Sequence, residues 1–219
     1  MPLIRETIVT TADPAGVVHM APLGLIADGK GWIVAPFHPS KTLDNLRHVP
    51  FAVVNYTDDV RVFAGCLTGR HQWPTVASDE IPVQRLAGAL AHAELAVDYV
   101  TEDEKRPRFH CRVLRLVTHA PFLGFNRAQA AVIEAAILVS RLEMLPRDKI
   151  EKEIAYLQIA VGKTAGAAEQ EAWQWLMERI AAWYSGRPPS PGDHKGRPYS
   201  GVKGRPLWSP ALNRKSMRR

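Results

Sequence analysis

Over the first 120 residues, short apolar runs and apolar–polar alternation recur between turn-forming residues, a pattern typical of β-strands. Asp28-Gly29 favours a tight hairpin, and Asp58-Asp59 marks another turn. The pattern predicts seven strands, at residues 4–11, 17–27, 32–37, 51–57, 60–68, 89–100 and 109–118. Short strands in this number predict an antiparallel barrel or sandwich rather than parallel strands joined by helices. One short helix, at 42–48, is inserted among them.

The period of the apolar residues becomes helical after Pro121. Three helices are predicted, at residues 126–145, 148–162 and 167–184. The first has Asn126 as a suitable N-cap and is apolar on nearly all sides, so we expect it to be buried on most sides. Glu134 interrupts this helix and is expected to be a half-buried carboxylate that needs a partner.

The chain therefore divides into a strand-rich part at 1–120, a helical subdomain at 121–186 and a third segment at 187–219. That last segment holds six prolines, four glycines, nine basic residues and one acidic residue, so it is predicted to be a disordered basic tail. The formal charge of the chain is +6, but the first 186 residues have two more acidic than basic side chains. Basicity alone is thus a weak argument for a nucleic-acid-binding domain.

Several classes of protein are disfavoured by simple absences in the sequence. No run approaches the roughly 20 apolar residues that a membrane helix needs. The N-terminus lacks a basic segment followed by an apolar one, and the two cysteines, Cys66 and Cys111, suit a reducing compartment, so we expect a cytoplasmic protein. The eight histidines show no metal-binding spacing, and neither a GxGxxG nor a Walker motif occurs.

The segment 36–45 carries the clearest candidate chemistry. A predicted strand ends there, and a loop with Ser40, Lys41 and Thr42 leads into the short helix that contains Asn45. A helix N-terminus offers free N–H groups and a partial positive charge, and two hydroxyls and an ammonium would add donors for an anion such as phosphate. On local chemistry alone, the alternative is favoured, because helix caps are common: Thr42 caps the helix and Lys41 is solvated.

The order of elements around this segment resembles the FMN-binding split barrels, the superfamily of pyridoxamine-phosphate oxidases and flavin reductases. A hairpin is followed by Pro36-Phe-x-x-Ser-Lys-Thr-Leu-Asp-Asn-Leu46, and then by the strand that includes Val54-Asn-Tyr-Thr-Asp-Asp59. Together with His19-Met-Ala-Pro-Leu-Gly24 and Phe125-Asn-Arg-Ala128, these pieces are similar to a family of unassigned function found in methanogens and methylotrophs. The resemblance extends over residues 3–185 and omits the tail.

The resemblance implies an α+β fold, a six- to seven-stranded antiparallel split barrel followed by helices, with FMN as cofactor. It implies that the strand with His19, Ala21 and Gly24 lies along the flavin ring. The phosphate would be held in the segment of Ser40, Lys41, Thr42 and Asn45. Arg127 is a further candidate, because a planar guanidinium at the start of a helix suits a phosphate.

The resemblance also implies a homodimer in which the flavin lies between the two chains. The expected activity is that of a flavin-dependent oxidoreductase, with a reduced nicotinamide or a pterin as the small-molecule substrate and an association with tetrahydromethanopterin-linked one-carbon metabolism. Two alternatives remain open from the sequence: a flavin-binding protein without turnover, and a nucleic-acid-associated protein that uses the basic tail. No acid or base is singled out as catalytic, and we expect no metal.

Overall fold

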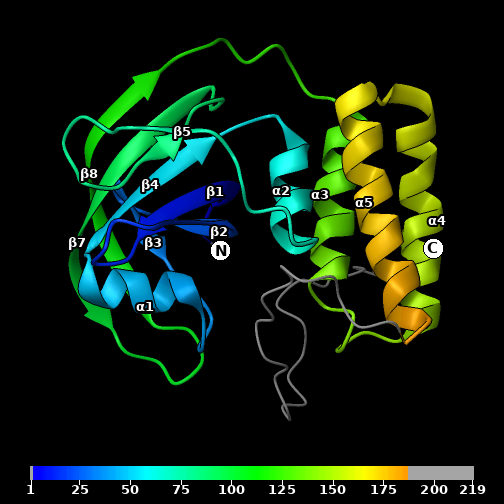
Figure 1. The fold of residues 1–219 in the computed structure, drawn as a ribbon, viewed down its shortest axis with the longest axis horizontal. Helices are drawn as coiled ribbons and strands as arrows, with labels where there is room; N and C mark the ends of the chain where they lie inside the picture. Colours follow the sequence, from blue (N-terminus) through cyan, green and yellow to red (C-terminus); the bar gives the residue numbers. More distant parts are fainter. Residues whose placement is uncertain (1, 187–219) are drawn as a thin grey trace, which may run out of the picture.

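A barrel and a layer of helices stand side by side in the computed structural model, which describes residues 2–186 (Figure 1). The predicted basic tail, 187–219, lies outside the described residues. Six strands form a closed antiparallel barrel in the order β1-β2-β3-β8-β7-β4. Their bounds are β1 Ile4–Ala12, β2 Val18–Asp28, β3 Gly31–Val34, β4 Phe51–Tyr56, β7 Ala91–Thr101 and β8 Arg108–Thr118. Two short strands, β5 Thr75–Val76 and β6 Arg85–Leu86, pair separately. The predicted α+β class and antiparallel barrel are confirmed.

The strand predicted at 60–68 is wrong, because this segment forms the helix α2 (Val60–Leu67). Asp59 caps the helix, since its carboxylate accepts the Arg61 backbone N–H at 3.1 Å. Val60 and Ala64 lie four residues apart and pack on the helical layer, whereas Phe63 faces the barrel. The run of apolar residues is therefore explained by burial on two sides rather than by a strand.

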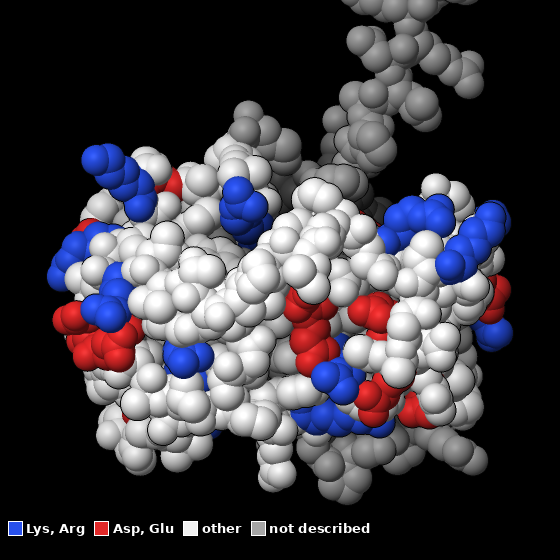
Figure 2. Space-filling model, turned by 90° about the horizontal axis from the view of Figure 1, so that it is seen from above, with Lys and Arg blue, Asp and Glu red and all other residues white. Residues whose placement is uncertain are grey.

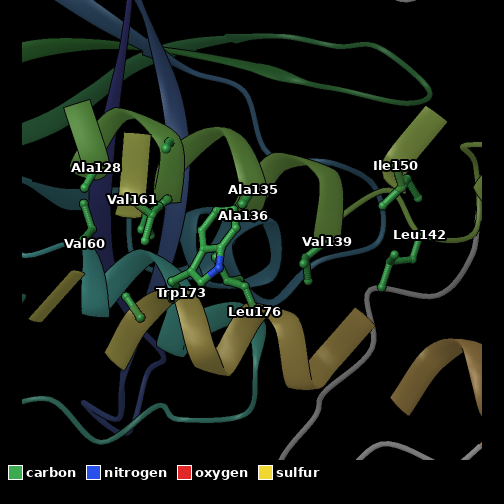
Figure 3. Close-up of a cluster of buried hydrophobic side chains, with 14 residues drawn as sticks. Val60, Ala128, Ala135, Ala136, Val139, Leu142, Ile150, Val161, Trp173 and Leu176 are labelled. Carbon is green, nitrogen blue, oxygen red and sulfur yellow. The ribbon is translucent and has the colours of Figure 1, made fainter. Parts of the chain in front are cut away.

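Three helices follow the barrel: α3 (Arg127–Val139), α4 (Arg147–Thr164) and α5 (Ala167–Tyr184). Asn126 caps α3 as expected, but the helix ends earlier than residue 145, in a turn at Ser140. Small side chains of α3 face Trp173 and Leu176 of α5, and all of them are nearly inaccessible (Figure 3). Glu134 is exposed, so the expectation of a half-buried carboxylate is wrong.

The helix α2 joins the two parts of the molecule. One side of it contributes Val60 and Ala64 to the core of α3 and α5. The other side contributes Val62 and Phe63 to a second core, which includes Ile8 of β1 and Met20 of β2. The helices therefore cover the outer face of β1 and β2. No helix within residues 2–186 is long and apolar enough to cross a membrane.

A buried carboxylate fastens the segment before β6 to β7. Glu94 is 0% exposed, and its two oxygens accept the backbone N–H groups of Asp79 and Glu80 at 2.9 and 2.8 Å. His92 is also buried, with Nε2 at 3.2 Å from Glu94 Oε1 and Nδ1 at 2.9 Å from His119 Nε2. Burial alone would raise the pKa of Glu94, but these hydrogen bonds outweigh it and hold the pKa below its ordinary value.

Candidate functional site

The barrel has a seam along β2. This strand pairs with β1 from Val18 to Ile26, but it pairs with β3 only at its last three residues, Ile26, Ala27 and Asp28. Within the described part of the chain, the backbone of 18–25 has no strand partner on its other edge. Unpaired N–H and C=O groups at such an edge are available to a ligand.

The helix α1 (Lys41–His48) lies against β1 and β2, which it contacts directly. Ser40 is the N-cap, because its hydroxyl accepts the Leu43 N–H at 3.3 Å, so the expectation that Thr42 is the cap is wrong. Thr42 is only 3% exposed, and its hydroxyl forms no hydrogen bond within residues 2–186. Lys41 is exposed and has no ion pair among the described side chains.

Asn45 connects α1 to the strand pair. Its side-chain amide donates to the Thr11 hydroxyl at 3.0 Å, and both residues are buried. Thr11 is the register partner of His19 on β2. Because directly opposed residues of antiparallel strands point to the same face, His19 lies on the face of the sheet that Asn45 contacts. Candidates far apart in sequence, on β2 and α1, are thus brought together.

Ala21 and Gly24 do not share one face. Ala21 pairs with Val9, whose side chain is in the barrel core, whereas Gly24 pairs with Glu6 on the outer face. A Cβ atom on Gly24 would lie 2.9 Å from the Ile4 side chain and 3.2 Å from a carboxylate oxygen of Glu6. Gly24 therefore allows the close approach of β1. Because the side chains of the strand point to opposite faces, a single ligand could contact His19, Ala21 and Gly24 together only through their backbone groups.

Arg127 is not brought to this group within one chain. It is the first residue of α3, which begins at the end of the molecule opposite α1 (Figure 1). Its side chain is exposed. The prediction that Arg127 and Ser40 hold one phosphate is therefore not met in a single chain, and it requires a second copy.

Two residues near the seam were not identified from the sequence. Arg106, in the loop between β7 and β8, donates from Nε and Nη2 to the carbonyl oxygen of Ala35, at 3.0 and 2.9 Å. Glu6 lies over Gly24, and its pKa is raised because burial and the nearby Glu134 carboxylate disfavour its charged form. The charged composition of the 101–108 loop was the available signal, but it did not distinguish one arginine.

The arrangement can bind an anion at one end and a flat polar group along its side. The start of α1 provides N–H groups, the Lys41 ammonium and the unpaired Thr42 hydroxyl. The seam of β2 provides backbone donors and acceptors next to it. Among the described residues, no cluster of histidine, cysteine and carboxylate side chains is suited to a metal ion.

Similar proteins have been solved. The chain is similar to the FMN-bound protein MM1853 from Methanosarcina mazei, with a TM-score of 0.72 and 21% identity over 82% of this chain and 96% of that chain. It is also similar to the 2-nitrobenzoate 2-nitroreductase NbaA of Pseudomonas fluorescens (TM-score 0.46, 17% identity, 54% of this chain and 66% of that one). A further similar structure is the styrene monooxygenase flavin reductase SMOB of Pseudomonas putida S12 (TM-score 0.46, 16% identity, 54% and 83%).

At 21% identity the MM1853 structure shows the shared fold alone. Two family models match the sequence itself. The one described as "Protein of unknown function (DUF447) N-terminal domain" matches residues 5–120, and the one described as "Protein of unknown function (DUF447)" matches residues 126–178. Since the first of these alone spans more than half of the chain, the protein belongs to the DUF447 family.

Proposed function

We propose that this protein binds FMN, with the phosphate at the start of α1 and the isoalloxazine ring along the seam of β2. The observation that carries the proposal is the contact of α1 with β1 and β2, where Asn45 meets Thr11 beside an unpaired strand edge. The MM1853 protein, which shares the fold over most of both chains, is described as FMN-bound, and this supports the same cofactor here.

The residues at α1 fit a phosphate group. The Thr42 side chain is largely buried at the start of the helix, and its hydroxyl, which has no hydrogen bond among the described residues, would donate to a phosphate oxygen. Ser40 already caps the helix by accepting the Leu43 N–H, and the proton of its hydroxyl stays available to donate to a phosphate oxygen. Lys41 would supply a positive charge from the solvent side. When bound, FMN would supply two-electron redox chemistry, and the protein would orient it and shield it from water.

We propose that the bound flavin serves an oxidoreductase, with a reduced nicotinamide or a reduced pterin as electron donor. The alternative is a flavin-binding protein without turnover. Both classes need the same binding site, so the discriminating measurement is steady-state oxidation of each donor by the FMN-loaded protein. Turnover with one of them supports an enzyme, and absence of turnover with all of them favours the second class.

The phosphate site gives the first testable prediction. Lys41→Ala combined with Thr42→Val should weaken FMN binding about 10- to 100-fold, because charge-assisted hydrogen bonds contribute roughly 1.5–3 kcal/mol. The affinity for riboflavin, which lacks the phosphate, should change less than about twofold. Fluorescence titration of the purified protein with each flavin measures both dissociation constants. Lys30→Ala, in the exposed β2–β3 turn, is the matched control. An equal loss for both flavins would refute the phosphate assignment.

We propose that two copies of this chain form a homodimer through the linker between β8 and α3. Phe122, Leu123 and Phe125 there are 55%, 88% and 100% exposed. Figure 2 views the molecule from the linker side and shows a broad uncharged band between charged flanks. A second copy would cover these side chains.

The dimer is tested by sedimentation of the full chain. The wild-type protein should have the mass of two chains, and Phe122→Ser combined with Phe125→Ser should shift it toward one chain. Tyr156→Ser, which alters an exposed aromatic residue on α4, should leave the mass unchanged. A wild-type mass of one chain at micromolar concentration would disprove the homodimer.

A further inference from the structure

The loop that leaves β3 has no strand partner, yet it is held in place. After Val34 the chain no longer pairs with β8, and residues 35–40 lead directly to the start of α1. The loop between β7 and β8 lies against these residues. It contacts the backbone of Ala35 and His38 and the ring of Phe37, so it constrains the path of this segment.

Arg106 makes the central contact. Its Nε and Nη2 both donate to the Ala35 carbonyl oxygen, at 3.0 and 2.9 Å, and its guanidinium carbon lies 4.4 Å from the centre of the Phe37 ring. Ala35 is buried and Arg106 is half-buried, so these bonds are partly shielded from water. A planar guanidinium can fork onto one carbonyl and stack on a ring at the same time, which a lysine ammonium cannot do.

The loop that carries Arg106 is itself a fixed turn. Asp103 Oδ1 accepts the backbone N–H groups of Lys105 and Arg106, both at 2.8 Å. The Lys105 carbonyl oxygen in turn accepts the His38 N–H at 2.9 Å. The segment before Ser40 is thus bonded to this turn at two points, Ala35 and His38.

A second connection reaches α1 directly. Arg47, in the last turn of the helix, makes a paired contact with the Glu102 carboxylate, with N–O distances of 2.6 and 2.5 Å. Both side chains are exposed, so this pair is expected to contribute less than the partly shielded hydrogen bonds of Arg106. Glu102 and Arg106 therefore hold the two ends of the region that includes Ser40, Lys41 and Thr42.

We propose that Arg106 is a positioning residue for flavin binding, which sets the path of residues 35–40 and so places Ser40, Lys41 and Thr42 around the phosphate. This inference rests on the proposed FMN site. Arg106 acts through Ala35 and Phe37, not as a phosphate ligand. Its removal loosens the loop, and the loss falls on the phosphate end of the ligand because the ring lies along β2, whose pairing with β1 is untouched.

The experiment compares FMN and riboflavin affinities of the full chain for wild type, Arg106→Ala, Arg106→Lys and Arg108→Ala. Arg108 is an exposed arginine two residues away without an ion pair among the described residues, so it is the matched control. Arg106→Ala should lose about tenfold in FMN affinity and less than about twofold in riboflavin affinity. Arg106→Lys keeps the charge without the fork, so it should recover only part of the loss, and Arg108→Ala should match wild type.

Three results would overturn the proposal while leaving FMN binding intact. Unchanged FMN affinity in Arg106→Ala would show that the loop does not depend on this residue. Equal losses for both flavins would indicate a general structural role, and full recovery by Arg106→Lys would indicate a direct charge contact. If the alanine variant does not fold, Glu102→Gln tests the second connection, with about a threefold loss expected for FMN only. If the wild type binds no FMN, the proposed function is wrong and this inference falls with it.

Discussion

Glu94→Ala should lower the free energy of unfolding by about 3–5 kcal/mol, the range for removing one member of a buried charged group. The carboxylate has no access to solvent, and it accepts two backbone N–H groups and contacts His92. Truncation would leave these donors without a partner in the interior, where each unsatisfied group is costly. The loss is measured as the shift of the urea denaturation midpoint at constant slope.

The pH dependence identifies the charge as the cause. Because the pKa of Glu94 is lowered in the fold, its contribution to stability is complete above the ordinary value of 4.5 and is lost as the pH falls through the folded pKa. Glu94→Gln should be destabilised at pH 7 and should lose less stability than wild type on acidification. Glu143→Ala, at an exposed carboxylate without an ion pair among the described residues, should stay within about 0.5 kcal/mol of wild type. A Glu94→Ala loss under about 1 kcal/mol would contradict the assigned role.

Phe109→Ala should destabilise the barrel by about 3–5 kcal/mol, as expected for the removal of a fully buried aromatic ring. Phe109 is 1% exposed and packs in the barrel core with Leu46 of α1 and Leu95 of β7. The Arg47 guanidinium also lies 5.6 Å from the ring centre. The cavity would open beneath α1, so FMN affinity should fall together with stability.

The matched control is Tyr156→Ala, which removes a similar ring that is 75% exposed on α4. This variant should remain within about 0.5 kcal/mol of wild type. Chemical denaturation of both variants provides the comparison. If Phe109→Ala were no less stable than Tyr156→Ala, the packing of Phe109 against Leu46 and Leu95 would not contribute to the stability of the barrel.

Periodic elements were well predicted from the sequence, and elements buried on two sides were not. The helix predicted at 167–184 is found as Ala167–Tyr184, because one apolar side repeats along it and Gly166 and Gly186 flank it. The sequence of α2 predicts a strand because it is rich in valine and has apolar residues on two opposite sides of the helix, which hides the helical period. Its helical state depends on contacts with α3 and α5, which lie far away in sequence.

The candidate site was predicted in part for a similar reason. The loop and helix at Ser40 are local, and their chemistry can be read from neighbouring residues. The seam of β2 is a matter of pairing between distant strands, so no local pattern indicates it. Arg106 reaches Ala35 across 71 residues of sequence, and the antiparallel pairing of β3 with β8 brings them together.

The position of α2 has a consequence for how the molecule unfolds. This helix belongs by sequence to the segment matched at 5–120, yet one side of it completes the core of the helices that follow. A chain cut at residue 120 would expose Val60 and Ala64 to water, and a chain begun at 121 would lack one wall of its interior. The barrel and the helices are therefore expected to melt as one cooperative unit, with a single calorimetric transition for both parts.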